Sequence, residues 1–354
     1  MSDYAAVADV LKLQAGACAA MGSPFSGALL GHAAEALPED PSLQTAFQPW
    51  AEAGRKAIFD DAAALRWLGA LHDAVLEAPD SPLADAYPGI GRAGDPGRAW
   101  PLVHAFVRDH AARVADFMRH EPQTNEVRRS AVLLPGFLTV AAETELPLRI
   151  LELGASAGLN QLWDQRRYRL GETLRWGPGD APVTIDADWR GGAPPLDAPV
   201  QVIERAACDR SPVPLTDPVQ RRRLRAYVWP DQADRLERLD AAVAQALAAG
   251  STVEREDAVV WAGRNAAPRS GVASVVFHSV FFQYMPAESQ AALIQTLGDF
   301  GAQASPDAPL GWLRMEPALG SPGRMELRLT LWPDGRERVL AAAHPHGAWV
   351  EWNG

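Results

Sequence analysis

The stretch RILELGASAGLN, residues 149–160, constrains the fold more than any other part of this 354-residue chain. The apolar run at residues 148–153 predicts a buried strand, and the glycines that follow predict a sharp turn. A strand ending in such a turn has two common uses. It can present a serine nucleophile, here Ser156, or it can let a nucleotide-like cofactor approach the backbone. The surrounding sequence favours one of these uses.

The spacing of apolar residues changes at the same point in the chain. Before about residue 143 the spacing is helical, as in Leu65, Leu68, Leu71 and Val75, and a second apolar face runs from residue 103 to 118. A further helix is expected over residues 124–143, with a kink or break at 134–136, where a proline stands. We therefore predict an all-helical N-terminal domain, residues 1–143, that covers the cleft of an α/β domain, residues 144–354.

The second part of the chain alternates short apolar runs with helical segments, which predicts a mainly parallel sheet covered on both faces. An extra strand or hairpin is possible within residues 181–195. The chain ends in a predicted antiparallel hairpin. The predicted strands are residues 148–153, 200–206, 252–256, 274–282 and 310–315, and the predicted helices are 159–166, 217–249 and 286–300.

Composition argues against several classes of function. A net charge of −11 disfavours sequence-independent binding to a nucleic-acid phosphate backbone, because such binding depends on Lys and Arg. Cys18 and Cys208 lie too far apart in sequence to suggest a disulfide framework or a metal site, so a reducing cytoplasm is the simplest setting. Residues 13–34 carry no charged side chain, but their Gly and Ala content and a Ser-Pro break disfavour a membrane span. We expect a cytoplasmic protein with no membrane or nucleic-acid partner.

The serine-nucleophile interpretation is the weaker of the two. In α/β-hydrolases the elbow follows earlier strands and an HGGG-type loop, whereas this strand is the first of its domain and no such loop precedes it. A triad in chain order can still be assembled from Ser156, Asp257 and then His278 or His344, although histidines in such an order arise easily by chance.

The cofactor interpretation gains support from the next two strands. Asp209 stands at the tip of the second, where a carboxylate can accept ribose hydroxyls, and Asp257 stands at the tip of the third, near an adenine amino group. In the order and position of these strands, residues 148–315 resemble the class I S-adenosylmethionine-dependent methyltransferases. The terminal hairpin is similar to that fold's reversed last strand. The expected fold is therefore a Rossmann-like, methyltransferase-type sheet with an antiparallel C-terminal hairpin.

Five separated segments carry a closer resemblance. They are QTNEVRRSAVLLPGF, LELGASAGLN, YVWPDQ, FHSVFFQY and HPHGAWVEW. Together they resemble an uncharacterised bacterial family, domain of unknown function 2332, over nearly the whole chain. That family supplies a map of motifs but no reaction.

The methyltransferase resemblance implies a cofactor site. About forty residues separate the first helix from the second strand, so Asp186 or Asp188 competes with Asp209 for the ribose position. Asp209 is also a suitable helix cap, and Asp257 suits a surface turn. Glu152 is expected near the methionine end of the cofactor, or else to fix the loop. The cofactor-binding candidates are Glu152, Gly154, Ser156, Gly158, Asn160, Asp209, Asp257 and Ser279.

Catalytic and substrate candidates come from polar residues in apolar surroundings. His278, at the end of the fourth strand, can act as a general base, although a hydrogen-bonded core histidine is as common. Tyr284 and Gln283 follow it. Asn125, Glu126 and Arg129 share a face if their segment is helical, although the arginines of that segment can equally sit in solvent. His344 and His346 share a face if their segment is a strand, and no metal site is predicted.

These observations predict methyl transfer from S-adenosylmethionine to an unknown small molecule. One alternative is a ligand-binding protein without catalytic activity, which the serine in place of the middle glycine favours. A serine hydrolase acting through Ser156 is a weaker alternative. Neither the methyl acceptor nor the oligomeric state follows from the sequence.

Overall fold

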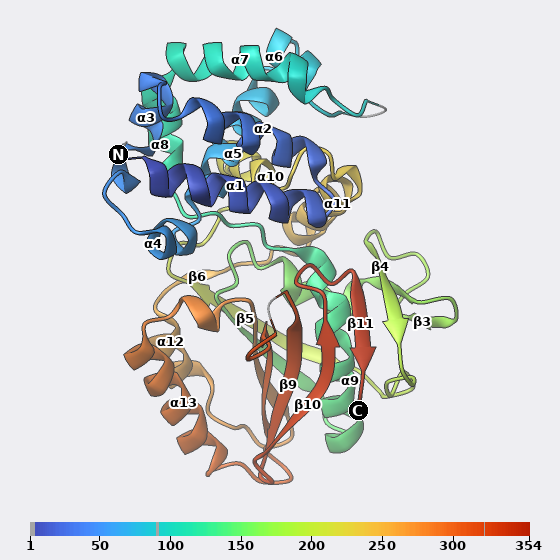
Figure 1. Cartoon of the computed structure of the whole chain (residues 1–354). Coiled ribbons are helices and arrows are strands. Elements are labelled where there is room, and N and C mark those ends of the chain that lie inside the picture. The colour runs from blue at the N-terminus through green and yellow to red at the C-terminus, as the bar shows by residue number, and fades with distance from the viewer. Residues whose placement is uncertain (1–3, 90–91, 322) are drawn as a thin grey trace. The chain divides into compact units, whose positions relative to one another are not determined.

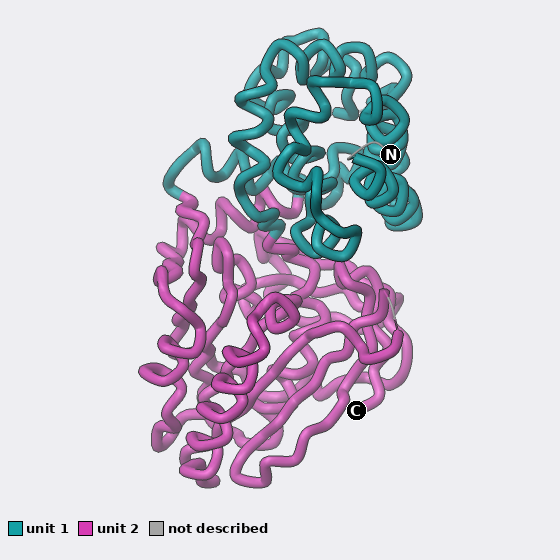
Figure 2. Tube along the Cα trace, turned by 60° about the vertical axis from the view of Figure 1, so that its left-hand side comes forward, with its two compact units in different colours: residues 1–124, 216–237 teal, residues 125–215, 238–354 magenta. Residues whose placement is uncertain are grey.

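The computed structural model describes residues 4–89, 92–321 and 323–354. Contacts within the chain divide it into two compact units (Figure 2). Unit 1 comprises residues 1–124 and 216–237, and unit 2 comprises residues 125–215 and 238–354. This division differs from the sequence division at residue 143, because helix α9 (Ser130–Thr144) packs on strands of unit 2.

Unit 1 is helical throughout its described residues, apart from turns and an isolated bridge between Gly89 and Arg92. Leu68, Leu71 and Val75 of α5 are buried in its core. The apolar face over residues 103–118 belongs to two helices, because the backbone leaves the helical conformation at His110. The elements are α1 (Ala5–Ala20), α2 (Pro24–Ala36), α3 (Pro41–Phe47), η1 (Gln48–Trp50), α4 (Arg55–Asp60), α5 (Ala63–Glu77), α6 (Pro82–Ala86), α7 (Pro96–Asp109), α8 (Ala111–Met118) and α10 (Pro218–Ala226).

The segment 216–237 belongs to unit 1 because it supplies partners for buried polar groups of α5. His72 Nδ1 donates to the carbonyl oxygen of Val228 (2.9 Å), and Arg222 Nε donates to Asp73 (2.8 Å). Helix α11 (Ala233–Ala249) then leads the chain back into unit 2. The connection between strands β5 (Val202–Asp209) and β6 (Glu254–Arg255) of the sheet therefore runs through unit 1.

Unit 2 is built on an 11-stranded sheet, in the order β3-β2-β4-β11-β10-β9-β8-β7-β1-β5-β6 (Figure 1). Most neighbouring strands are parallel, and β8, β9, β10 and β11 are antiparallel to one another in turn. The predicted mixed α/β fold, with a mostly parallel sheet and an antiparallel hairpin, is confirmed at this level. The strands are β1 (Leu148–Leu153), β2 (Arg167–Leu170), β3 (Leu174–Trp176), β4 (Thr184–Arg190), β5 (Val202–Asp209), β6 (Glu254–Arg255), β7 (Ala273–Ser279), β8 (Leu310–Pro317), β9 (Met325–Trp332), β10 (Arg336–Ala343) and β11 (Trp349–Trp352).

Strand β1 lies between β5 and β7, and both run parallel to it. After β1 the chain first forms β2, β3 and β4 at one end of the sheet, then β5 and β6 on one side of β1, and then β7 and β8 on the other side of β1. Each predicted strand is present, although β6 has only two residues. The uncertain region at 181–195 contains β4, which joins β2 and β3 in an extension at the far end of the sheet.

The two faces of the sheet are covered by different helices. Alternate residues of β1 point to opposite faces, so that Leu151 and Leu153 join the core beneath α12 (Ala258–Asn265) and α13 (Ala287–Gly301). On the other face lies α9, whose Phe137 ring stacks on Trp163 with ring centroids 4.3 Å apart. The predicted break at 134–136 does not occur. Helix α9 continues through Pro135 because its apolar side chains are buried against the sheet.

No helix in the described ranges combines the length and apolar character needed to cross a membrane.

Candidate functional site

The glycine-rich loop after β1 follows a left-handed path that explains its residue types. Gly154, Ser156 and Gly158 have φ values of +63°, +55° and +71°. Glycine adopts this conformation without steric cost, whereas serine does so less readily. A side chain at Gly154 would also overlap the ring of Phe281, which packs directly against the loop. The short 3-10 helix η3 (Leu159–Gln165) follows, in place of the predicted helix at 159–166.

Asp209, at the end of β5, ties the neighbouring loop to the glycine-rich one. Its Oδ2 accepts a hydrogen bond from the Ser156 amide (2.8 Å), and its Oδ1 accepts one from the Ser211 amide (2.8 Å). Asp209 therefore holds the left-handed serine in place. Asp186 and Asp188 lie on β4, which is separated from β1 by five other strands. They therefore do not lie next to the glycine-rich loop, as Asp209 does.

The segment that precedes α9 closes over the same loop. Asn125 Oδ1 accepts a hydrogen bond from the Leu159 amide (2.9 Å), and Asn160 Nδ2 donates to the carbonyl oxygen of Glu126 (3.4 Å). Asn125 has φ +37°, and Glu126 caps the 3-10 helix η2 (Val127–Arg129). The helical face expected for these residues is therefore not formed, because the chain at Asn125 is left-handed. The segment nevertheless contacts the chain that follows the glycine-rich loop, at Leu159 and Asn160.

Arg129 connects this segment to two further loops. Its Nη1 donates to the carbonyl oxygen of Ser279 (3.3 Å), at the end of β7, and its Nε donates to the carbonyl oxygen of Pro345 (3.0 Å). Four sequence motifs far apart in the chain thus meet at the carboxyl ends of β1 and β7. They are the segments around residues 125–129, 154–160, 278–284 and 344–347.

Glu152 is a buried carboxyl group beside this loop, on the face of the sheet that α9 covers. Its side chain is 3% exposed, and Oε2 has no hydrogen-bond partner among the described residues. Burial raises the pKa of Glu152 to about 8, against the attraction of the nearby Arg166 guanidinium. Arg166 is itself fully buried and donates to the side chain of Asn160 (3.3 Å).

His278 is held on the opposite face of the sheet by two side chains. Trp312 Nε1 donates to His278 Nε2 (3.1 Å), and an indole nitrogen can only donate, so the ring hydrogen is on Nδ1. That nitrogen donates to Glu316 Oε1 (2.7 Å). His278 is fully buried and both of its ring nitrogens are engaged. This arrangement favours the alternative of a hydrogen-bonded core histidine over the general base.

Glu316 organises this region, although it was not among the catalytic or binding candidates. Its Oε1 also accepts hydrogen bonds from the amides of Phe281 (3.0 Å) and Phe282 (3.1 Å). Burial by itself raises the pKa of Glu316, but the hydrogen bonds from His278 and from these amides outweigh it and hold the pKa below its usual value. A signal was present in the sequence, because alternation along β8 places Glu316 on the same face as Trp312.

Backbone strain also gathers at this edge of the sheet. Five described residues other than glycine have a left-handed backbone, and three of them are Asn125, Ser156 and Val280. A β-branched residue such as Val280 is a genuine outlier there. Its φ is +53°, and its amide donates to the carbonyl oxygen of Met315 (2.8 Å). Strained residues of this kind are often found at functional sites.

The remaining candidates lie at the periphery of these loops. Asp257 caps α12, where its Oδ1 accepts the amides of Val259 (2.9 Å) and Val260 (3.4 Å). Gln283 and Tyr284 form the exposed 3-10 turn η4 (Phe282–Tyr284). His344 and His346 lie beyond the end of β10, so the expected shared strand face is absent, although their rings are 5.7 Å apart. In the described part of the chain, no three His, Cys, Asp or Glu side chains are grouped to hold a metal ion.

Comparison with known proteins assigns the chain to a family. The model of a bacterial family described as an uncharacterized protein conserved in bacteria, DUF2332, matches residues 8–352. The chain belongs to this family. The DUF2332 match includes every candidate residue described above. Comparisons with curated proteins and with solved structures found no match.

Proposed function

We propose that the chain is an S-adenosylmethionine-dependent methyltransferase that acts on a small molecule. One observation carries the proposal. Counted in chain order, the parallel strands β6-β5-β1-β7-β8 lie in the spatial order 3-2-1-4-5. This is the order of a doubly wound sheet, which binds nucleotide-like ligands outside the carboxyl ends of its strands, where the order reverses. The glycine-rich loop follows β1, at that point of reversal.

The side chains around the loop fit such a cofactor. The unpartnered oxygen of Glu152 is an acceptor in need of a donor, such as an ammonium group. Each oxygen of Asp209 accepts one amide, which leaves lone pairs for ribose hydroxyls. Asp257 caps α12 through its Oδ1. The antiparallel strand β9 beside β8 further favours a methyltransferase over a hydride-transferring enzyme, whose sheet more often continues parallel.

The cofactor supplies an electrophilic methyl group, so the protein's work is mainly alignment. Holding two reactants in line can contribute roughly 7–11 kcal/mol. The strained loops at Ser156 and Val280 are fixed by Asp209 and by Met315, which suits them to this task. Because His278 is engaged on both nitrogens, it orders the loop through Glu316 and does not remove a proton.

A turnover assay tests the proposal. The protein is incubated with S-adenosylmethionine labelled in the methyl group and with fractionated small metabolites, and S-adenosylhomocysteine is measured. We expect product in at least one fraction, and Glu152→Gln should reduce it. Binding of S-adenosylhomocysteine without turnover on any acceptor would instead indicate a ligand-binding protein.

A serine hydrolase is favoured by one observation, the left-handed Ser156 directly after a strand. Against it, His278 gives both ring nitrogens to Glu316 and Trp312 and so is unavailable to a relay with Ser156. A fluorophosphonate probe separates the two functions. We expect no labelling of Ser156, and Ser156→Gly should preserve cofactor binding.

A further inference from the structure

The chain passes between the two units three times, at residues 124–125, 215–216 and 237–238. Close to each of these connections, a residue of unit 2 is hydrogen-bonded to one short segment, residues 156–165, which begins in the glycine-rich loop and ends with η3. We call this segment the hub. The connections are far apart in sequence, yet a movement of the hub acts on all three.

The first two connections are held at the glycine-rich end of the hub. Unit 2 begins at Asn125, whose Oδ1 accepts the amide hydrogen of Leu159 (2.9 Å). At the second connection, the Val213 amide donates to the carbonyl oxygen of Ser156 (3.0 Å), shortly before the chain enters unit 1 after Leu215. The two hydrogen bonds lie on either side of Gly158, so the loop cannot change its path there without disturbing one of them.

The second connection is stiff, because Val213 lies between Pro212 and Pro214. A proline ring fixes its own φ near −65° and restricts the residue before it to extended conformations. A shift of Ser156 is therefore passed along this stretch to Leu215 and is not absorbed within it.

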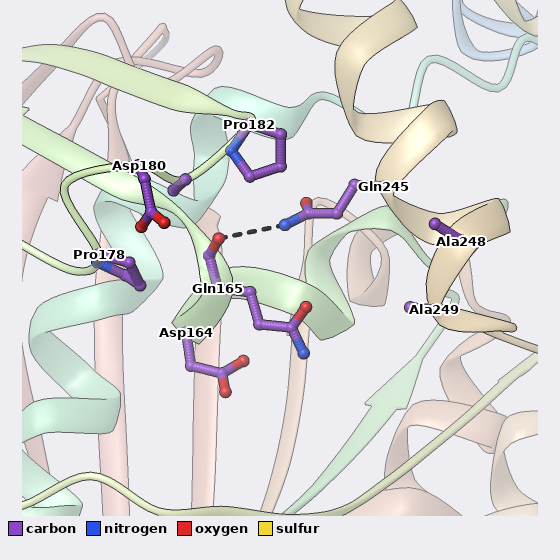
Figure 3. A pocket seen from close by; sticks show the side chains of 9 residues that line it. Asp164, Gln165, Pro178, Asp180, Pro182, Gln245, Ala248 and Ala249 are labelled. Atoms are coloured by element: carbon purple, nitrogen blue, oxygen red, sulfur yellow. Dashed lines mark hydrogen bonds between the residues drawn. The ribbon is translucent and has the colours of Figure 1, made fainter.

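The third connection lies inside helix α11, which continues from unit 1 into unit 2. About two turns after the helix enters unit 2, Gln245 Nε2 donates to the carbonyl oxygen of Gln165 (3.1 Å), the last residue of η3. Figure 3 shows this bond as a dashed line, with the Gln245 carboxamide reaching from α11 toward the end of η3. Gln245 is 9% exposed, so water competes little for the bond.

The middle of the hub is packed so that it opens as one unit. The residues from Leu159 to Trp163 are all buried, and η3 contacts both α9 and β5. Arg205 Nε of β5 also donates to the carbonyl oxygen of Gln161 (3.1 Å). Buried and hydrogen-bonded segments open cooperatively, so the loss of one of the three connecting bonds should loosen the other two.

We propose that the hub is a conformational coupling device, which links the order of the three connections to one another and to the order of the glycine-rich loop. Fixing one of them reduces the conformational entropy that remains to be lost at the others. The coupling is reciprocal, as between any two linked equilibria. One consequence rests on the proposed function, namely that S-adenosylhomocysteine bound at the loop slows amide exchange in the connections.

Amide hydrogen exchange of the full-length protein without ligand tests the coupling itself. Asn125→Ala removes the acceptor of the Leu159 amide, and we expect exchange to rise there and also at Val213, by roughly two- to tenfold, the range for one lost hydrogen bond. Asn125→Asp keeps the acceptor oxygen and should leave both amides as in the wild type. The matched control is Asn265→Ala, which removes a side-chain hydrogen bond to the carbonyl oxygen of Trp261 in α12 and should raise exchange in α12 alone.

A reciprocal variant covers the case in which Asn125→Ala fails to fold. Val213→Pro removes the amide that bonds to Ser156 and leaves every side chain of the hub in place. We expect it to raise exchange of the Leu159 amide. Glu172→Gln, which changes an exposed acid in the β2–β3 turn outside the hub, should leave that exchange unchanged.

An increase confined to the altered connection in each variant would overturn the proposal, and so would an equal increase at Val213 in Asn265→Ala. With S-adenosylhomocysteine added to the wild type, binding that leaves exchange in the connections unchanged would overturn it as well. Absence of binding would contradict the proposed function, and the variants without ligand would still decide on the coupling.

Discussion

Glu152 and Glu316 are buried carboxyl groups whose surroundings shift their pKa values in opposite directions. Glu152 is desolvated without a hydrogen-bond donor on Oε2, so its protonated form is favoured. Glu316 accepts three donors on one oxygen, so its ionised form is favoured. The two lie on opposite faces of the sheet. Each keeps its Oε2 without a partner among the described residues, but only Glu316 holds the β7 loop, through the three donors on its Oε1.

The raised pKa of Glu152 predicts a pH-dependent stability. Its folded pKa of about 8 lies above the ordinary value of 4.5, so its contribution is fully present below pH 4.5 and is lost as the pH rises through about 8. The loss approaches about 1.4 kcal/mol per pH unit. Urea unfolding of Glu152→Gln should lack this slope, and Glu172→Gln should keep it. Parallel pH profiles for the wild type and Glu152→Gln would contradict the account.

Two substitutions of Glu316 should lower the free energy of unfolding by different amounts. Glu316→Ala leaves the buried His278 ring and two partly buried amides without an acceptor and should cost about 3–5 kcal/mol of unfolding free energy. Glu316→Gln retains an acceptor oxygen and should cost about 1 kcal/mol. Denaturant unfolding gives both values, and the nitrogen shifts of His278 report its tautomer. Equal losses for the two variants would show that the three hydrogen bonds are unimportant.

Residue roles were only partly predictable from the sequence. Asp209 could be placed at a strand tip beside the glycine-rich turn, because strand ends are marked by polar residues after apolar runs. Nothing in the run WDQRRYRL distinguishes the buried Arg166 from its exposed neighbour Arg167, since both follow the same helical turn. His278 stood out in the sequence as a polar residue in an apolar strand, but the sequence did not show that Glu316 and Trp312 would engage both of its ring nitrogens.

At the scale of elements, the loops after β1 and β7 are packed against each other by Gly154 and Phe281. The boundaries of β1 were predictable, since its apolar run ends at clear turn residues. The terminal hairpin was predicted only in outline, because the run at residues 338–352 forms two strands, β10 and β11. The helix expected at residues 124–129 was not, because its polar composition suits a helix start and only the contact with Leu159 draws Asn125 into a left-handed conformation.

Gly154→Ala tests this packing. The added Cβ would overlap the Phe281 ring, and overpacking typically costs about 1–3 kcal/mol beyond the backbone strain. Gly250→Ala is the matched control, because Gly250 has a similar φ of +65° with open space around it. We expect the larger loss of stability at Gly154, with partial recovery in Gly154→Ala combined with Phe281→Ala. Equal losses at the two glycines would mean that the ring does not contact the loop.

At the scale of the whole molecule, the two units are interleaved in sequence. The division at residue 143 was inferred from a change of apolar spacing, which cannot reveal that residues 216–237 return to the helical unit. A fragment of residues 1–124 lacks Val228, which accepts the hydrogen bond of His72, and Arg222, which pairs with Asp73 in addition to Arg113. We expect it to melt without cooperativity, and the same fragment joined by a flexible linker to residues 216–237 to melt cooperatively. Calorimetry distinguishes the two, and cooperative melting of both would contradict the assignment.

The central claim is that the glycine-rich loop, at the point where strand order reverses, binds a nucleotide-like cofactor. Titration calorimetry with S-adenosylmethionine and S-adenosylhomocysteine measures this most directly. The account predicts that both bind the wild type below millimolar concentration, that Glu152→Gln weakens binding, and that Glu172→Gln does not. Absence of binding by both ligands at millimolar concentration would contradict it.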